Sequence, residues 1–293
     1  MTFEIKNLPS ADVESLRPGL LESLIGSRTG SRRLSFVGSM LTLLLARYGL
    51  GDSLVCFDAK AGTLKAGQAD GLQPRTLEVL KSLNIADEIL NHGCHMYEVA
   101  FWNPKGDGIE RTSFVPDVTA ASRYKHEVTI HQGRIERIME ENLALYSPNC
   151  IQRCTNFIDF QMDPEGSAQF PLRIELDVES ADGVKTRKIV RSKYLIGADG
   201  AHSQVRNSMG LKLVGETTDH IWGVVDFVAE TNFPDVRKRC AIHSDSGSVM
   251  IIPRERIYTG QYLTRLYVQM KDEVLADEDS TDDQILRQKS RQR

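Results

Sequence analysis

Residues 194–206 constrain the fold of this chain more than any other stretch. An apolar strand pattern runs directly into the turn Gly197-Ala198-Asp199-Gly200, and a polar helix start follows at once. Glycine lets another molecule approach the backbone closely, and open α/β sheets present their ligands at the carboxyl ends of strands. The motif therefore predicts a bound nucleotide, although an ordinary tight strand-to-helix connection would use the same residues.

Composition and charge limit the kind of partner. The 293 residues are 41% apolar and 26% charged, with a net charge of -4, which is typical of a soluble globular protein. No basic patch predicts nucleic-acid binding, no apolar run is long enough to cross a membrane, and no secretory signal opens the chain. The five cysteines lack zinc or redox spacing, so we expect free thiols, no metal site and a cytoplasmic protein.

A strand-helix-strand pattern begins at residue 34. We expect a strand at residues 34–37, a turn at Gly38, a helix over residues 40–48 and a second strand at residues 54–57. The second strand ends in Asp58, 20 positions beyond Gly38, which is the layout of a dinucleotide-binding unit. The unit has one glycine where three are expected, so either the site is impaired or the gene model is defective.

Further along, the patterns predict a loop at residues 65–73, a helix opened by Pro74, and strands at residues 96–102, 109–115 and 126–132. Two or three strands follow between residues 157 and 190. Cleanly alternating segments at residues 222–228, 248–252 and 262–269 then predict an antiparallel sheet with one solvated face. This change of pattern indicates a second domain.

Three stretches carry a family resemblance: residues 65–78, with the sequence KAGQADGLQPRTLE; the Gly-Ala-Asp-Gly turn; and Ile252-Pro253-Arg254-Glu255 followed by Arg265-Leu266-Tyr267. From about residue 37 to residue 270 the chain resembles the FAD-dependent aromatic hydroxylases of the para-hydroxybenzoate hydroxylase class, and most closely the fungal phenol 2-monooxygenase branch. The first stretch is typical of that branch, and the turn is shared by the whole class.

The resemblance implies an α/β fold, in which an FAD-binding Rossmann-like domain of the glutathione-reductase type is joined to an antiparallel β-sheet substrate domain, both incomplete. We expect a loosely ordered leader at residues 1–33 and the FAD-binding domain at residues 34–210, with residues 95–125 contributing to the substrate domain. The substrate-domain sheet is expected at residues 211–270, and a polar tail with a helix start at residues 271–293.

The resemblance also implies a set of cofactor contacts. Asp58 is expected to hold the adenosine ribose, with Lys60 near a basic position of the family. Asp199 and Gly200 are expected to serve both FAD and the incoming NADPH. The remaining expected contacts lie at the pyrophosphate turn, along the ribityl and isoalloxazine parts and near the flavin ring: Gly38, Gln68, Ala69, Gly71, Gln132 and Arg265.

Asp70, Arg254 and Tyr267 match the polar residues around the phenol. In such enzymes NADPH reduces the flavin, oxygen adds to give a flavin hydroperoxide, and the electron-rich ring attacks its distal oxygen. Asp70 would accept the phenol proton, Tyr267 would orient the hydroxyl, and Arg254 or Arg265 would stabilise negative charge. Ortho-hydroxylation of a phenolic ring by molecular oxygen is therefore the expected reaction, and a homodimer is a further expectation.

Two departures from the family matter. The glycine fingerprint is missing, and no Gly-Asp-Ala-x-His segment or thioredoxin-like domain follows toward the carboxyl end. Low FAD affinity is therefore expected. Two hypotheses stay open: a flavin hydroxylase, or a catalytically inactive, truncated fragment that serves as a binding or interaction module. A nicotinamide-dependent dehydrogenase is disfavoured, because the loop at residues 65–72 has no role there.

Overall fold

A computed structural model of the protein describes residues 2–5, 36–65, 70–216, 221–244 and 247–270. The chain divides into two compact units. Unit 1 contains the described parts of Met1–Ala66 and Gln132–Val214, and unit 2 contains the described parts of Gly67–His131 and Gly215–Arg293. Within these residues no helix is long and apolar enough to cross a membrane.

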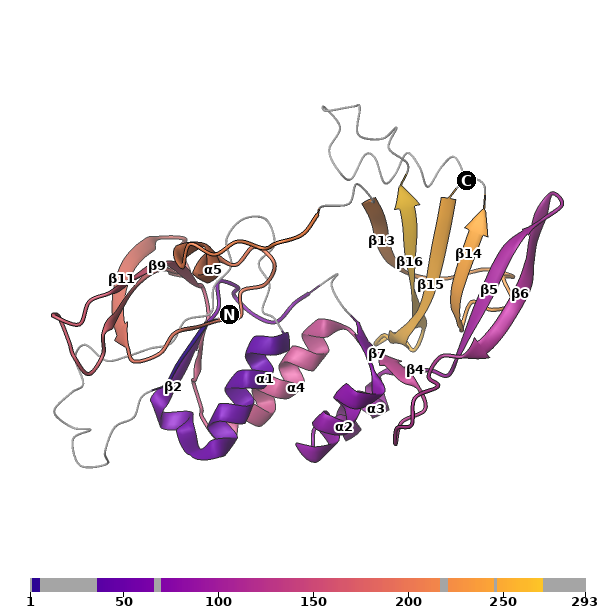
Figure 1. Ribbon diagram of the computed structural model, residues 1–293. Helices are drawn as coiled ribbons and strands as arrows, with labels where there is room; N and C mark the ends of the chain where they lie inside the picture. Colours follow the sequence, from indigo (N-terminus) through magenta and orange to yellow (C-terminus); the bar gives the residue numbers. More distant parts are fainter. Residues whose placement is uncertain (1, 6–35, 66–69, 217–220, 245–246, 271–293) are drawn as a thin grey trace. The chain divides into compact units, whose positions relative to one another are not determined.

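Unit 1 is built on a four-stranded sheet in the order β12-β1-β2-β8. Its central strand β2 (Leu54–Phe57) pairs antiparallel with β1 and parallel with β8, and helices α1 and α4 pack against one another (Figure 1). A second sheet has the order β11-β10-β9. The other elements of unit 1 are β1 (Thr2–Ile5), α1 (Phe36–Leu45), a π-helix (Ala46–Leu50), a 3-10 helix (Gly51–Ser53), α4 (Gln132–Ala144), β8 (Ile151–Gln152), β9 (Thr155–Met162), β10 (Leu172–Glu179), β11 (Lys185–Ser192), β12 (Ile196–Gly197) and α5 (Gln204–Ser208).

Apolar side chains from both sheets of unit 1 form one core. Phe57 of β2 packs there with residues of β9, β10, β11 and α5, all of them buried. These are Phe57, Phe157, Ile174, Leu176, Val190 and Val205. The core fixes the end of β2, where Asp58 follows.

Unit 2 is built on a six-stranded sheet in the order β13-β16-β15-β14-β5-β6 (Figure 1). A smaller sheet, β3-β7-β4, lies in the same unit together with α2 and α3. The elements are β3 (Gly71–Leu72), α2 (Pro74–Ser82), α3 (Ala86–His92), β4 (Cys94–Met96), β5 (Glu98–Lys105), β6 (Gly108–Pro116), β7 (Glu127–Thr129), β13 (Ile221–Val228), β14 (Arg239–Ser244), β15 (Gly247–Arg256) and β16 (Tyr262–Met270). The strands β5 and β6, from residues 95–125, therefore belong to the sheet of the carboxyl-terminal strands.

Several local predictions are confirmed. Strand β2 covers residues 54–57 as expected, and Pro74 opens α2 at its first turn. Leu77 and Leu80 of α2 are fully buried, as the apolar face of an amphipathic helix should be. The α/β class is confirmed. The alternating segments form antiparallel pairs, β13 with β16, β16 with β15, and β15 with β14.

Other local predictions are wrong. Phe36 and Val37 lie in α1 and not in a strand, and Gly38 is a buried helical residue and not a turn. The reason is that one glycine cannot make the sharp turn between strand and helix, so the apolar run continues as helix. Within this helix the Thr42 hydroxyl donates to the Gly38 carbonyl at 2.7 Å. Gln132 likewise begins α4 and does not end a strand.

The amino-terminal segment also contains regular structure. Thr2–Ile5, expected within a loosely ordered leader, forms β1 and pairs with β2 and β12. The remaining residues of that expected leader and the helix start expected in the polar tail lie outside the described residues, as do Gln68 and Ala69.

Candidate active site

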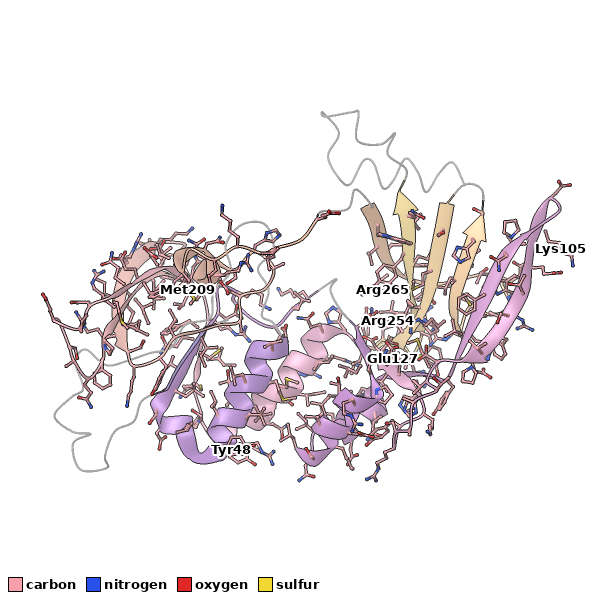
Figure 2. All side chains as sticks on the ribbon, in the orientation of Figure 1. Tyr48, Lys105, Glu127, Met209, Arg254 and Arg265 are labelled. Atoms are coloured by element: carbon pink, nitrogen blue, oxygen red, sulfur yellow. The ribbon has the colours of Figure 1, made fainter. Side chains whose placement is uncertain are left out.

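A pair of buried arginines on neighbouring strands of unit 2 lies at the centre of a charged cluster. Arg265 on β16 stands opposite Ile252 of β15 and opposite Asp226 of β13. Arg254 follows two residues after Ile252, where the pairing of β15 shifts between Pro253 and Arg256. Proline cannot donate to the ladder, and a bulge of this kind re-aims side chains. Both arginine side chains are only 1% exposed. Figure 2 labels the two residues in unit 2.

Three carboxylates compensate the two guanidinium groups. Nη1 of Arg254 lies 2.9 Å from Oδ2 of Asp70, and Nη1 of Arg265 lies 3.2 Å from the same atom. Arg265 also donates twice to Asp226, with Nε and Nη2 each 2.7 Å from a carboxylate oxygen. Nε of Arg254 lies 3.1 Å from Oε2 of Glu255. Bidentate pairing of this kind fixes orientation as well as charge.

Pairing and burial shift the pKa values of Asp226, Arg265 and the neighbouring His131. Burial would raise the pKa of Asp226, but the hydrogen bonds and charge of Arg265 outweigh it and the pKa is lowered. Burial opposes the charged form of Arg265 too, yet Asp226 raises its pKa. Burial lowers the pKa of His131, whose backbone N–H donates to Oε1 of Glu255 at 3.0 Å. The shifts of both pKa values favour the charged forms of the Asp226–Arg265 pair.

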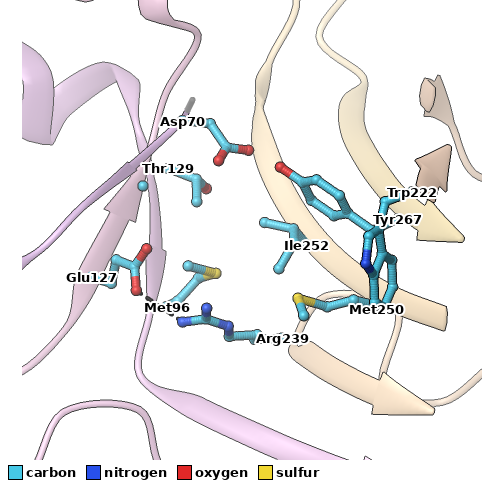
Figure 3. Close-up of a pocket in the computed structure, with 10 residues that line it drawn as sticks. Asp70, Met96, Glu127, Thr129, Trp222, Arg239, Met250, Ile252 and Tyr267 are labelled. Carbon is cyan, nitrogen blue, oxygen red and sulfur yellow. Dashed lines mark hydrogen bonds and ion pairs between the residues drawn. The ribbon is translucent and has the colours of Figure 1, made fainter. Parts of the chain in front are cut away.

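A cavity of about 430 Å3 in unit 2 adjoins this cluster. Its walls are largely apolar, and Figure 3 shows the Asp70 carboxylate and the Tyr267 hydroxyl directed toward one another on one side of it. The lining residues are Asp70, Gly71, Met96, Glu127, Thr129, Trp222, Arg239, Met250, Ile252 and Tyr267. A mostly apolar cavity of this size with a few convergent polar groups is typical of a small-molecule site.

Within the described residues, the Asp70 carboxylate is paired through one of its two side-chain oxygens. Arg254 and Arg265 both meet Oδ2, and no residue in the described part of the chain donates to Oδ1. The Tyr267 hydroxyl lies 3.4 Å from Nη1 of Arg265, which links it to the same charge array. The sequence-predicted residues Asp70, Arg254, Arg265, Tyr267 and Gly71 are thus brought together in one unit.

A second charged group lies on the other side of the cavity. Nη1 of Arg239, on β14, lies 2.9 Å from Oε2 of Glu127 and 3.0 Å from Oδ1 of Asp117. Gln73 also donates to Oε2 of Glu127, at 2.7 Å. Burial raises the pKa of Glu127, although Arg239 opposes this. In Figure 3 Met96 and Ile252 lie between this group and the Asp70 side, and Met250 lies beside Arg239.

In unit 1, three of the other predicted polar residues, Asp58, Lys60 and Gln132, lie in one buried network. Oδ1 of Asp58 accepts the Lys60 backbone N–H at 3.1 Å, and Oδ2 is hydrogen-bonded by Arg153. Lys60 Nζ lies 3.4 Å from Oε2 of Glu136, and Gln132 donates to Oε1 of Glu136 at 2.8 Å. The structure therefore joins Asp58, Lys60 and Gln132.

Burial is the largest influence on the pKa values of this network. It raises the pKa of Asp58 and of Glu140, the second carboxylate that Arg153 binds, although Arg153 opposes both shifts. It lowers the pKa of Lys60, although Asp58 and Glu136 oppose that shift. The carboxylates and cations of the network therefore depend on one another for their charged forms.

The Asp199 carboxylate is hydrogen-bonded by groups at the start of α5. Oδ2 accepts the backbone N–H groups of Gln204 and Val205 at 2.7 and 3.2 Å, and Oδ1 is hydrogen-bonded by the Ser203 hydroxyl. The carboxylate thus satisfies the free amides at the start of α5. Gly200 has a φ of +82°, which favours glycine. This is the chemistry of a tight strand-to-helix connection, the alternative that the sequence left open.

Each unit also contains charged residues that the sequence did not predict as site residues. Asp226 is the one charged residue within the apolar pattern of residues 221–228, and that isolation is a usable signal for a buried partner of an arginine. Glu127, Arg239, Arg153 and Glu136 carry no comparable signal, because Glu136 pairs with Lys60 across 76 positions, Arg153 with Asp58 across 95, and Arg239 with Glu127 across 112. The described residues contain no group of three or more His, Cys, Asp or Glu residues placed to hold a metal ion.

Comparison with known proteins gives a consistent family. The model of a family described as FAD binding domain matches residues 35–292. The flavin-dependent oxygenase ucdD of Aspergillus ustus is 39% identical over 254 residues, which are 85% of this chain and 38% of that protein. The 3-hydroxybenzoate 4-monooxygenase of Comamonas testosteroni is 35% identical over 247 residues, or 81% of this chain and 37% of that protein.

Solved structures show the same fold at low identity. The p-nitrophenol 4-monooxygenase PnpA of Pseudomonas putida DLL-E4 superimposes with a TM-score of 0.70 at 18% identity, covering 91% of this chain and 60% of that one. The flavin-dependent monooxygenase PieE, solved in complex with FAD and substrate, gives 0.68 at 20% identity, covering 93% of this chain and 46% of that one. The chain spans less than two fifths of the length of the two curated relatives described above.

Proposed function

This chain belongs to the FAD-binding domain family of FAD-dependent aromatic hydroxylases, and on that premise we propose that it carries the phenol site of an NADPH-dependent monooxygenase that hydroxylates the ring ortho to its hydroxyl. The observation that carries the proposal is the cavity of unit 2, where Asp70, backed by two buried arginines, and Tyr267 meet an apolar wall. An aromatic ring fits such a wall, and its hydroxyl needs polar partners at one end.

The residues of unit 1 fit part of the cofactor. A carboxylate has about four acceptor positions, and Asp58, at the end of β2, uses one on each oxygen within the described residues. Asp58 would hold the adenosine ribose, Lys60 and Arg153 would offset phosphate charge, and Gln132 would meet the ribityl region. Asp199 keeps a helix-capping role in this arrangement, with Gly200 offering backbone for close approach. When bound, FAD supplies the redox chemistry and the activated oxygen.

The residues of unit 2 would prepare the phenol. Oδ1 of Asp70 accepts a hydrogen bond from the phenol hydroxyl and, as charge moves onto the ring, takes its proton. The Tyr267 hydroxyl orients the phenol oxygen. Arg254 and Arg265 lie behind Asp70 and stabilise the negative charge that the site carries throughout. Met96, Met250 and Ile252 exclude water from the ring, which strengthens these electrostatic interactions.

The test uses the 293-residue chain. The purified protein is mixed with FAD and examined for a protein-bound flavin spectrum, for phenol-dependent NADPH oxidation, and for the catechol that ortho-hydroxylation yields. Bound flavin with phenol-dependent turnover supports the proposal. A colourless protein that still binds phenol would favour the alternative of a binding module without catalysis. The expected homodimer and cytoplasmic location stay predictions, open to light scattering and to imaging of the tagged protein.

A further inference from the structure

The side of the cavity away from Asp70 has an excess of negative charge. Among the described residues that line the cavity Arg239 is the cation, and it is paired with both Glu127 and Asp117. The side chains of the two acids are 8% and 3% exposed, so solvent screens them little. One guanidinium against two carboxylates leaves this side net negative, and the Asp70 side likewise has two arginines against three carboxylates.

Glu127 also has an oxygen to offer. Gln73 and Arg239 both donate to Oε2, whereas no donor within the described ranges reaches Oε1. Oε1 lies over Gly71, where an added Cβ would come within 2.0 Å of it. Gly71 and Glu127 both line the cavity. The absence of a side chain at residue 71 therefore leaves room for a carboxylate oxygen beside the cavity.

We propose that the cavity selects a phenol whose ring carries a second hydrogen-bond donor, an amine or a hydroxyl, remote from the reacting hydroxyl, with Glu127 as the specificity-determining acceptor. The inference rests on the proposed function, because it assigns the reacting hydroxyl to Asp70 and Tyr267. A protonated amine should gain the most binding affinity, because it forms a charge-assisted hydrogen bond with a buried carboxylate. A carboxylate substituent is rejected, since it faces Glu127 and finds the charge of Arg239 already compensated by Glu127 and Asp117.

The test compares three phenols that differ only at the para position: 4-(aminomethyl)phenol, 4-methylphenol and 4-hydroxybenzoate. Calorimetric titration of the full chain at neutral pH gives their dissociation constants. The amine is expected to bind at least about tenfold more tightly than the carboxylate, with the methyl compound between them. Equal affinities, or tighter binding of the carboxylate, would overturn the inference. The measurement on the wild-type protein is sufficient for this.

Two matched variants test whether the preference for the amine comes from Glu127. Glu127→Gln keeps the shape and the possible bonds to Gln73 and Arg239 but removes the charge, so the ratio of amine to carboxylate affinity should fall to within about threefold. Glu98→Gln removes the same charge from a half-exposed ion pair on β5 and should leave the ratio unchanged. An unchanged ratio in Glu127→Gln, with the fold verified by circular dichroism, would refute the role of Glu127.

Different results of these titrations would refute the proposed phenol site itself. If none of the three phenols binds, or if Asp70→Asn leaves all three affinities unchanged, the phenol site itself is wrong and the inference falls with it. If all three bind and depend on Asp70 without discrimination at the para position, only the inference is overturned.

Discussion

Oδ2 of Asp70 accepts a hydrogen bond from Arg254 at 2.9 Å and forms an ion pair with Arg265 at 3.2 Å, although the three residues come from different elements. Taking charges out of water is costly unless each is paired. The shared oxygen therefore fixes the direction of the Asp70 carboxylate, and within the described residues Oδ1 has no donor. This relationship connects the stability of unit 2 to its proposed chemistry.

Replacing Arg254 by methionine should destabilise unit 2 strongly. The change leaves three carboxylates with Arg265 as their remaining arginine, and breaking a buried pair typically costs about 3–5 kcal/mol. Both tryptophans, Trp102 and Trp222, lie in unit 2, so urea unfolding followed by tryptophan fluorescence reports on this unit. Lys105→Met, which breaks an exposed ion pair, is the control and should cost under about 1 kcal/mol. Similar midpoints for both variants would contradict a buried array.

Asp226 should make unit 2 sensitive to acid. Its folded-state pKa lies below the ordinary value of 3.8 because hydrogen bonds and charge from Arg265 outweigh burial. Its pairing therefore contributes stability that is fully present above the unfolded-state pKa and is lost as pH falls through the folded-state value. Asp226→Asn should cost about 1–3 kcal/mol at neutral pH.

The gap in stability between the wild type and Asp226→Asn should narrow as the pH falls below about 4. Urea midpoints measured across this range provide the test. Asp107→Asn removes an equal charge from the exposed turn between β5 and β6 and should show no pH-dependent gap. A gap in Asp226→Asn that stayed constant with pH would refute the linkage.

Gly197 should tolerate no side chain. An added Cβ would lie 2.9 Å from the Cβ of Val205, a buried residue of α5. Gly197→Ala should therefore destabilise unit 1 by about 1–3 kcal/mol through overpacking. Gly62→Ala, where an added Cβ meets nothing within 4 Å, is the control. Amide hydrogen exchange in β9 and α5 provides the measurement, and equal protection in the two variants would show that the close approach is unimportant.

Asp199 distinguishes two roles for the Gly-Ala-Asp-Gly turn. As the acceptor for the first amides of α5, it should be replaceable by asparagine at a small cost, whereas Asp199→Ala should lose about 1–2 kcal/mol. A direct charge contact with the cofactor would instead make Asp199→Asn weaken FAD binding while stability is kept. Thermal unfolding and FAD titration of both variants separate these cases. We expect FAD affinity to follow stability.

The sequence predicts the polar side of the cavity well, because the family resemblance names Asp70, Arg254, Arg265 and Tyr267 and the alternating pattern places Arg265 and Tyr267 on one face of β16. It does not predict the partners that neutralise them. Asp226 meets Arg265 through strand pairing across 39 positions, and the bulge after Pro253 that aims Arg254 depends on tertiary packing.

The amino-terminal unit shows where local patterns fail. Residues 34–37 have the apolar composition of a strand, but Phe36 and Val37 lie in α1 because no turn separates them from the following helical run. Thr2–Ile5 pairs with β2 instead, a long-range pairing that no local pattern encodes. Asp58 and Gln132 are joined through Lys60 and Glu136, so their proximity depends on how α4 packs.

The most direct test of the phenol site is calorimetric titration of the full chain with phenol, for the wild type, Asp70→Asn, Tyr267→Phe and the control Asp107→Asn. Saturable binding is expected in the wild type and in the control. The affinity should fall at least about tenfold in Asp70→Asn and by a smaller factor in Tyr267→Phe. Equal phenol affinity in all four proteins would contradict the assignment of this cavity.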